Sequence, residues 1–369
     1  AEYMGVAPLM EIYRKTLLFA VFLIHVVLGE SRQVPCYFIF GDSLVDNGNN
    51  NHLRSFARAD YFPYGIDFPG GPSGRFTNGR TTVDVIGQLL GFEDFIQPFA
   101  TAAGSEVLNG VNYASAAAGI REETGRQLGA RISFSGQVLN FLTTANQIAE
   151  ILGGPEAARG YLRQCIFSIG LGSNDYLNNY FLPLYYDTGS RYTVDQYADV
   201  LLQQYAQQLQ ILYDNGARKF SLIGLGKIGC SPFQLAMNSP DGVTCVSKVN
   251  SANRIFNDKL KGMVKRMNAK VKDGKFIFLD AYRIFEDLVA NSGTYGFSVT
   301  NAGCCGMGRN NGQLRCLPFQ IPCPNRNEYV FFDAFHPSEA ANIIIGRRSF
   351  KAEKPTDAYP FDISQLALI

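Results

Sequence analysis

Short apolar runs alternate with longer amphipathic stretches along most of the chain. Each run is almost continuous in apolar residues, which is typical of strands that are buried on both faces of a parallel sheet. The runs predict strands at residues 34–40, 110–114, 165–170, 219–224 and 275–279.

The stretches between these runs repeat apolar residues every three or four positions, which indicates helices. Thr193 is a suitable N-cap and the pair Asn215-Gly216 a suitable C-terminal signal for one of them. Strand and helix alternating in this way predict an α/β fold, with a parallel sheet covered by helices on both faces. Functional residues of such sheets gather at the carboxyl ends of the strands. The predicted helices cover residues 81–90, 135–152, 194–215, 246–271 and 338–350.

The N-terminal residues have the form of a secretory signal peptide. Arg14 and Lys15 precede an apolar run at residues 16–28, and the small residues Gly29 and Ser31 follow it. A single membrane anchor is the alternative, but the run is shorter than the roughly 20 apolar residues that span a bilayer. We therefore predict a cleaved signal peptide at 1–31, a secreted, extracellular (apoplast-like) protein, and no membrane segment in the mature chain.

No internal repeat or low-complexity linker divides the remainder, so residues 32–369 are predicted to form a single domain. Residues 65–82, rich in Gly and Pro, and the Cys-rich residues 300–324 look like long excursions from it. Residues 359–369 look like a tail packed on the surface.

Composition narrows the class of protein. Hydrophobic residues make up 46% of the chain and charged residues 18%, which predicts a packed globular core. A formal net charge of +1 argues against nucleic acid as a partner and against a polybasic membrane anchor.

Eight cysteines fit export, because secreted loops are commonly closed by disulfides. Cys230 and Cys245 bracket one short loop, whereas Cys36 and Cys165 stand at the starts of predicted strands, as buried thiols or as a pair. A zinc site competes for the remaining cluster, but adjacent cysteines without a nearby histidine fit usual zinc spacing poorly. That cluster comprises Cys304, Cys305, Cys316 and Cys323.

Polar residues occur at four places, three of them where predicted strands end, and together they favour acyl transfer. A serine attacks a carbonyl only when a base removes its proton and a third group orients that base. Ser43 follows the first strand, and the spacing Asp333-x-x-His336 supplies a base and its acid. His336 is preferred because His25 lies in the predicted signal peptide and His52 in a polar loop.

The developing oxyanion needs preset donors, each worth on the order of 3 kcal/mol of barrier. The backbone N–H of Ser43, a backbone N–H in residues 114–119 and the side-chain amide of Asn174 are the candidates. Asp42 and Asp175 are expected to serve as turn or loop anchors.

The sequences of these segments resemble those of the plant GDSL-type esterases/lipases of the SGNH-hydrolase superfamily, and the resemblance extends over nearly the whole mature chain. The matching segments are 40–50 (Phe-Gly-Asp-Ser-Leu-Val-Asp-Asn-Gly-Asn-Asn), 74–80 (Gly-Arg-Phe-Thr-Asn-Gly-Arg), 170–176 (Gly-Leu-Gly-Ser-Asn-Asp-Tyr) and 357–360 (Asp-Ala-Tyr-Pro).

The resemblance implies a three-layer α/β/α, flavodoxin-like fold with a parallel five-stranded sheet. It also implies ester hydrolysis by Ser43, Asp333 and His336, with Asn174 in the oxyanion hole. The family usually places a glycine in the second loop to donate its N–H there, and Ala116 takes that place here. If the site required a positive φ at this position, alanine would cost about 1 kcal/mol or more.

These observations predict a secreted serine esterase or lipase that hydrolyses acyl or acetyl esters through an acyl-enzyme on Ser43, without a cofactor or metal. The substrate would be a small-molecule, lipid or cell-wall ester, and the sequence leaves the oligomeric state open. Two alternatives remain at this point: an acyltransferase that uses the same acyl-enzyme, and a catalytically idle secreted binding protein.

Overall fold

A computed structural model describes residues 32–369, and the predicted signal peptide at 1–31 lies outside these described residues. The main sheet has five strands in the order β1-β2-β3-β4-β7. The first four are parallel, and β7 pairs antiparallel with β4. The mainly parallel sheet of the predicted α/β fold is confirmed. Its strands are β1 (Tyr37–Gly41), β2 (Ile166–Gly170), β3 (Lys219–Ile223), β4 (Lys275–Leu279) and β7 (Ala358–Tyr359).

The predicted strand at 110–114 is replaced by isolated bridges along the free edge of β1. Ile39 donates its N–H to the carbonyl of Val111 (3.1 Å) and accepts the N–H of Tyr113 (2.8 Å). Asn112 turns its own backbone away from β1, toward Gln97 (2.9 Å). The segment therefore lies beside β1 as predicted, but it pairs only through isolated bridges, because the N–H of Gly41 donates to Gln137 and not to the segment.

The fifth strand comes instead from the C-terminal residues, which the sequence indicated as a surface tail. That expectation was wrong, because the segment contributes β7 and a short helix, α12 (Ile363–Ala367). Ile363 and Leu366 are fully buried and pack with β4 residues in the second of two apolar clusters that flank the sheet. The tail is thus part of the core.

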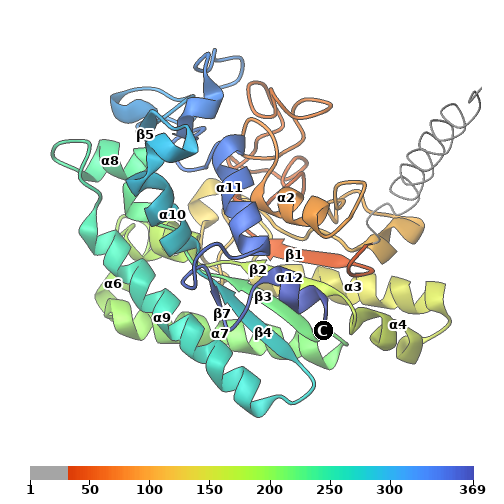
Figure 1. Cartoon of the computed structure of the whole chain (residues 1–369). Helices are drawn as coiled ribbons and strands as arrows, with labels where there is room; N and C mark the ends of the chain where they lie inside the picture. The colour runs from red at the N-terminus through yellow and green to blue at the C-terminus, as the bar shows by residue number, and fades with distance from the viewer. Residues whose placement is uncertain (1–31) are drawn as a thin grey trace, which may run out of the picture.

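Helices cover both faces of the sheet (Figure 1). Helices α3, α4, α7 and α9 pack on one face, and α2, α11 and α12 on the other. The five predicted helices are confirmed within two residues at each end. Besides α12, the α-helices of the described residues are α2 (Thr82–Leu89), α3 (Phe134–Leu152), α4 (Pro155–Leu162), α5 (Ser173–Asp175), α6 (Thr188–Arg191), α7 (Val194–Asp214), α8 (Pro232–Asn238), α9 (Ser247–Lys270), α10 (Ala281–Ala290) and α11 (Glu339–Phe350). Among the helices of residues 32–369, none combines the length and apolar character that crossing a bilayer requires.

A row of phenylalanines crosses the sheet on the face that carries α3, α7 and α9. The parallel register sets one phenylalanine of each strand beside the next, and neighbouring rings lie 4.6–5.9 Å apart. Cross-strand aromatic pairs stabilise a sheet beyond the area they bury. The row consists of Phe38, Phe167, Phe220 and Phe276.

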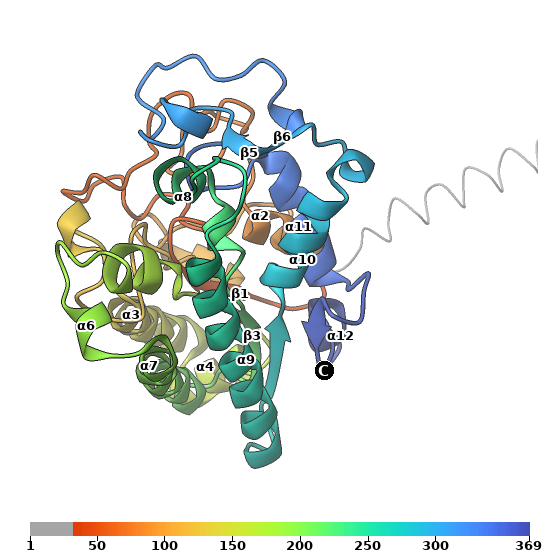
Figure 2. The ribbon, with the colours of Figure 1, turned by 90° about the vertical axis from the view of Figure 1, so that its left-hand side faces the viewer.

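A second, smaller sheet pairs β5 (Val299–Gly303) with β6 (Tyr329–Phe331) in parallel above the main sheet (Figure 2). It arises inside the Cys-rich excursion. Two disulfides close the loop between its strands, and all eight cysteines of the chain are paired. The pairs are Cys36–Cys165, Cys230–Cys245, Cys304–Cys323 and Cys305–Cys316.

A buried ion pair fixes the loop that precedes α2. Arg75 makes two hydrogen bonds of 2.8 Å to the carboxylate of Asp84, and both side chains are about 5% exposed. Burial alone would raise the pKa of Asp84, but the charge and hydrogen bonds of Arg75 outweigh it and lower that pKa.

Replacement Arg75→Met should lower the free energy of unfolding by about 3–5 kcal/mol, because it leaves a buried carboxylate without its partner. Arg163→Met is the matched control, since Arg163 pairs with Asp273 at the surface, with both side chains nearly half exposed. The control should change stability by less than about 1 kcal/mol. Urea unfolding measures both, and equal effects would contradict the argument.

Candidate active site

Ser43 stands in a tight turn directly after β1. The turn needs glycine at position 41, because a Cβ there would clash with the side chain of Val45. The buried amide of Gln137, on α3, holds the glycine from both sides. Its oxygen accepts the N–H of Gly41 (3.0 Å), and its nitrogen donates to the Gly41 carbonyl (2.8 Å).

Asp42 shapes the turn from within. Its carboxylate accepts the N–H of Leu44 (3.0 Å), and its carbonyl accepts the N–H groups of Val45 and Asp46. The expectation that Asp42 is a turn residue is confirmed. The serine between these contacts remains partly exposed.

Three side chains that are far apart in the sequence form one hydrogen-bonded chain. The Nε2 atom of His336 lies 2.8 Å from the Oγ of Ser43. On the other side of the ring, Nδ1 lies 2.8 Å from each carboxylate oxygen of Asp333. Asp333 and His336 follow β6, so their loop comes from the smaller sheet.

Asp333 is 1% exposed, and its charge is met by four hydrogen bonds. Besides the imidazole, Oδ1 accepts the backbone N–H groups of Phe335 and His336 at 2.8 Å each. Oδ2 accepts the hydroxyl of Tyr64 at 2.6 Å. Burial alone would raise the pKa of Asp333, but His336 and these hydrogen bonds lower it overall.

Tyr64 was missed by the sequence reasoning, because no local pattern links it to a carboxylate 269 positions away. It is 2% exposed and packs edge-on against Phe76 and Phe332. Burial and the neighbouring carboxylate raise its pKa well above 10, so it remains a donor. Phe76 also packs against the His336 ring, 5.0 Å away.

The loop after 110–114 and the loop after β2 meet beside the serine turn. Asn174 donates one amide hydrogen to the carbonyl of Ala118 (3.0 Å), and its oxygen accepts from Asn178 (2.7 Å). The N–H of Ala116 donates to Asp46 (2.9 Å), so the predicted oxyanion donor is already committed. The next residue, Ala117, has a φ of 65°, and its N–H has no acceptor within residues 32–369. The positive φ considered for Ala116 therefore falls on Ala117.

Two buried aspartates hold these loops. Asp46 accepts the N–H groups of Gly48, Asn49 and Ala116, each at 2.9 Å. Asp175 accepts three donors of residues 120–124, which confirms it as a loop anchor.

Burial acts on these carboxyl groups against their hydrogen bonds. Desolvation raises the pKa of Asp46 to about 7 and those of Asp42 and Asp175 to about 6, although each accepts at least one N–H. The loops are thus anchored by groups that burial makes costly to ionise.

The two arginines of the segment 74–80 and His52 lie outside this hydrogen-bonded chain. Arg75 pairs with Asp84, Arg80 pairs with Glu339 at 2.7 Å, and His52 is exposed. Within residues 32–369, no cluster of His, Cys, Asp or Glu has the form of a metal site.

Comparison with known proteins agrees with this geometry. The family model of the GDSL-like lipases/acylhydrolases matches residues 37–349. The chain belongs to this family. It is 66% identical over 333 residues to the GDSL esterase/lipase At5g45670 of Arabidopsis thaliana, which covers 90% of this chain and 92% of that protein. It is 44% identical over 364 residues to GDSL esterase/lipase 7 of the same plant, which covers 96% and 99%.

Membership places this GDSL hydrolase among the carboxylic ester hydrolases, and the α/β architecture with its mainly parallel sheet agrees. The four disulfides fit an extracellular protein.

The buried Asp42 predicts a stability that depends on pH. Its pKa in the folded chain, about 6, exceeds the ordinary value of 3.8, so its contribution to stability falls as pH rises through about 6. Asp42→Asn keeps the oxygen that accepts from Leu44 and cannot ionise. The variant should melt a few degrees higher than the parent at pH 8, since about 1 kcal/mol shifts the Tm of such a chain by roughly 2–4 °C.

At pH 3.5 the two proteins should melt within about a degree of each other, because Asp42 is then mostly protonated in both the folded and the unfolded chain. Calorimetry at both pH values measures this. Asp214→Asn, at an exposed site, is the control and should leave the difference between the two pH values unchanged. A parent as stable at pH 8 as its Asp42→Asn variant would contradict the assignment.

Proposed function

We propose that this GDSL hydrolase cleaves carboxylic esters through an acyl-enzyme on Ser43. The observation that carries the proposal is the continuous chain from Ser43 Oγ to His336 and on to Asp333, with 2.8 Å at each step. A hydroxyl in contact with an oriented imidazole is the arrangement that an activated serine nucleophile needs.

In the first half of the reaction, the Oγ of Ser43 attacks the ester carbonyl and its proton passes to Nε2 of His336. The tetrahedral intermediate then collapses, the imidazolium gives the proton to the departing alcohol, and the acyl group remains on Oγ. In the second half a water loses its proton to Nε2 and attacks the acyl carbon. Collapse releases the carboxylic acid, and Ser43 recovers its proton. Asp333 stays ionised throughout and stabilises the imidazolium.

The oxyanion is proposed to receive three donors from three different loops. They are the N–H of Ser43, the N–H of Ala117 and the second amide hydrogen of Asn174. The free N–H groups of Ser43 and Ala117 within residues 32–369 support this set, as does the single bond that the Asn174 amide nitrogen donates. Preset donors act strongly because they need no reorganisation when the charge develops.

We further propose that residues 1–31 are a removed signal peptide, that residues 32–369 act as a single domain, and that the mature enzyme is secreted. The four disulfides support export, because they form in oxidising compartments. The proposed substrate is a lipid or cell-wall ester, or a small ester of the same chemistry.

The variants Ser43→Ala and His336→Ala test the nucleophile and the base. Each should lower kcat for p-nitrophenyl acetate by about 10⁴-fold or more, because either change removes the activated hydroxyl. Circular dichroism should show that both remain folded. A fluorophosphonate should label the parent chain and fail to label Ser43→Ala. Activity that survives in Ser43→Ala would mean that another residue is the nucleophile.

Tyr64 is proposed as a positioning residue for Asp333. Tyr64→Phe removes one hydrogen bond to a buried carboxylate, which predicts a loss of about tenfold in kcat. Because that hydrogen bond lowers the pKa of Asp333, its loss should also move the acid limb of the pH–rate profile to higher pH.

Tyr61→Phe is the matched control for Tyr64→Phe. The Tyr61 ring lies 5.3 Å from that of Tyr64, but its hydroxyl donates to the carbonyl of Cys316. The control should keep the acid limb of the parent. A Tyr64→Phe profile that falls in rate without shifting would indicate a structural effect only.

A further inference from the structure

Large apolar side chains are exposed together on two loops above the smaller sheet. Phe56 is 68% exposed, Phe319 83% and Ile321 90%. Clustered exposed apolar side chains are characteristic of interaction sites. We call the set the apolar rim, and it consists of Phe56, Phe62, Leu314, Leu317, Phe319 and Ile321.

The two loops are joined by direct hydrogen bonds, so the rim is one surface. The N–H of Phe319 donates to the carbonyl of Phe62 (2.7 Å), and the hydroxyl of Tyr61 donates to the carbonyl of Cys316 (2.9 Å). Arg315 also donates to the carbonyl of Phe56. Figures 1 and 2 both show the Cys-rich loop lying beside the loops that follow β1.

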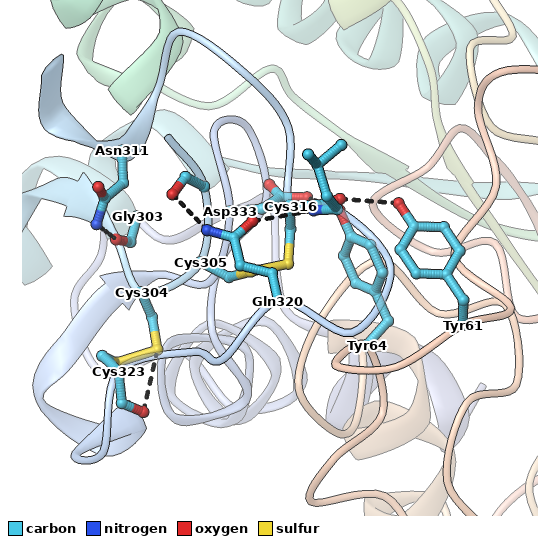
Figure 3. The surroundings of a disulfide bond; sticks show 12 residues. Tyr61, Tyr64, Gly303, Cys304, Cys305, Asn311, Cys316, Gln320, Cys323 and Asp333 are labelled. Carbon is cyan, nitrogen blue, oxygen red and sulfur yellow. Dashed lines mark hydrogen bonds between the residues drawn. A yellow bond between two sulfur atoms is a disulfide. The ribbon is translucent and has the colours of Figure 1, made fainter. Parts of the chain in front are cut away.

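The rim is held in place from below. The disulfides Cys304–Cys323 and Cys305–Cys316 tie its Cys-rich loop to the smaller sheet (Figure 3). The Gln320 amide adds two hydrogen bonds, donating to Gly306 (2.7 Å) and accepting from Leu317 (3.1 Å). The apolar side chains therefore stay exposed because the backbone that carries them is fixed.

Phe319 is the least expected residue of the rim. Its φ of 63° is a conformation that bulky residues rarely adopt and that glycine adopts freely. Its side chain is mostly exposed, so folding alone favours glycine at this position. A strained backbone that presents an exposed phenylalanine is an observation from which a function is fairly inferred.

Arginines outnumber acidic residues around the rim, where Arg326 pairs with Asp67 and Arg58 lies near Asp60. Residues 300–327 contain three arginines and no aspartate or glutamate. On the neighbouring loop, Arg54 and Arg58 are exposed, and Asp60 lies 3.8 Å from Arg58. Apolar side chains framed by arginines complement a surface that is apolar inside and anionic outside, as a lipid membrane is.

The rim is also connected to the catalytic centre. The loop that carries Phe56 and Phe62 continues to Tyr64, whose hydroxyl binds Asp333. Figure 3 shows Tyr61, Tyr64 and Asp333 beside the disulfide of Cys305. A surface that binds at the rim is thereby held next to the proposed triad.

We propose that the apolar rim docks this hydrolase on an anionic lipid surface, from which it takes its ester substrate. The side chains of Phe319 and Ile321 enter the boundary between head groups and acyl chains, and the exposed Arg54, Arg58 and Arg315 contact the head groups. The proposal names the substrate class of the function proposed above and rests on it, but the docking is measurable without catalysis.

The test uses the purified chain and vesicles of ether-linked lipids, which contain no ester to hydrolyse. Vesicles of phosphatidylcholine and phosphatidylglycerol are compared with vesicles of phosphatidylcholine alone, by sedimentation. The double variant Phe319→Gly/Ile321→Ser should bind the anionic vesicles at least about tenfold more weakly than the parent. Arg54→Gln/Arg58→Gln should reduce the preference for anionic vesicles.

The matched control is Leu139→Gln, on the surface of α3, where a 63%-exposed leucine lies outside the rim. It should bind as the parent does. Turnover of p-nitrophenyl acetate should be unchanged in the rim variants and the control, so this readout reports separately on the proposed catalysis. Phe319→Gly should not lower the melting temperature, because glycine relieves the backbone strain.

Three outcomes would overturn the docking proposal. The parent chain could fail to bind anionic vesicles, the rim variant could bind as well as the parent, or Leu139→Gln could lose as much binding as the rim variant. Binding lost together with p-nitrophenyl acetate turnover would also count against it, because the rim would then be part of the site itself.

Discussion

The carboxylate of Asp333 is the constraint around which the site is arranged. A charge that is 1% exposed is costly unless hydrogen bonds replace its water. Here the imidazole, two backbone N–H groups and Tyr64 do so. These donors come from the loop after β6 and from the excursion after β1, so satisfying one charge brings the smaller sheet onto the main one. The same contacts orient His336 toward Ser43.

Buried carboxylates also hold the other loops of the site, but there burial outweighs the hydrogen bonds. Asp46 and Asp175 tie the backbone of three loops together, and yet burial raises the pKa of both. Such groups hold the loops in place while making their ionised form unfavourable. Asp333 differs because the imidazole and the Tyr64 hydroxyl bind it in addition to backbone N–H groups, and together they outweigh its burial. Anchoring and catalysis thus use the same residue type, and the side chains that bind the carboxylate separate the two roles.

Much of this arrangement is readable from the sequence, for reasons that are local. Buried parallel strands are continuous apolar runs, and helices begin and end at caps such as Thr193, so β1 to β4 and five helices were predicted. Ser43 stood out because it follows a predicted strand, and His336 because histidine is scarce. The pairing of Cys36 with Cys165 was one of two open alternatives.

What the sequence did not reveal depends on contacts between distant segments. Tyr64 meets Asp333 only after folding, and the N–H of Ala116 is lost to Asp46 only when the two loops meet. The pattern at 110–114 predicts a strand, but the N–H of Gly41, which the next rung of the ladder would need, donates to the side chain of Gln137. The C-terminal segment appeared peripheral because its strand, β7, has only two residues and is too short to produce a recognisable hydrophobic pattern in the sequence.

The exposed rim shows why stapled loops accompany this fold. Large apolar side chains on a flexible loop would collapse onto the protein, and the entropy of a free loop would oppose ordering them on a surface. Disulfides and the bonds of Gln320 meet that ordering cost during folding, before any surface is bound. The rim then loses less conformational freedom when it binds, as is general for preorganised surfaces. The N–H of Phe319 donates to the carbonyl of Phe62, and the loop of Phe62 continues to Tyr64, which binds Asp333. The bonds that keep Phe319 exposed are therefore linked to those that hold the carboxylate of the site.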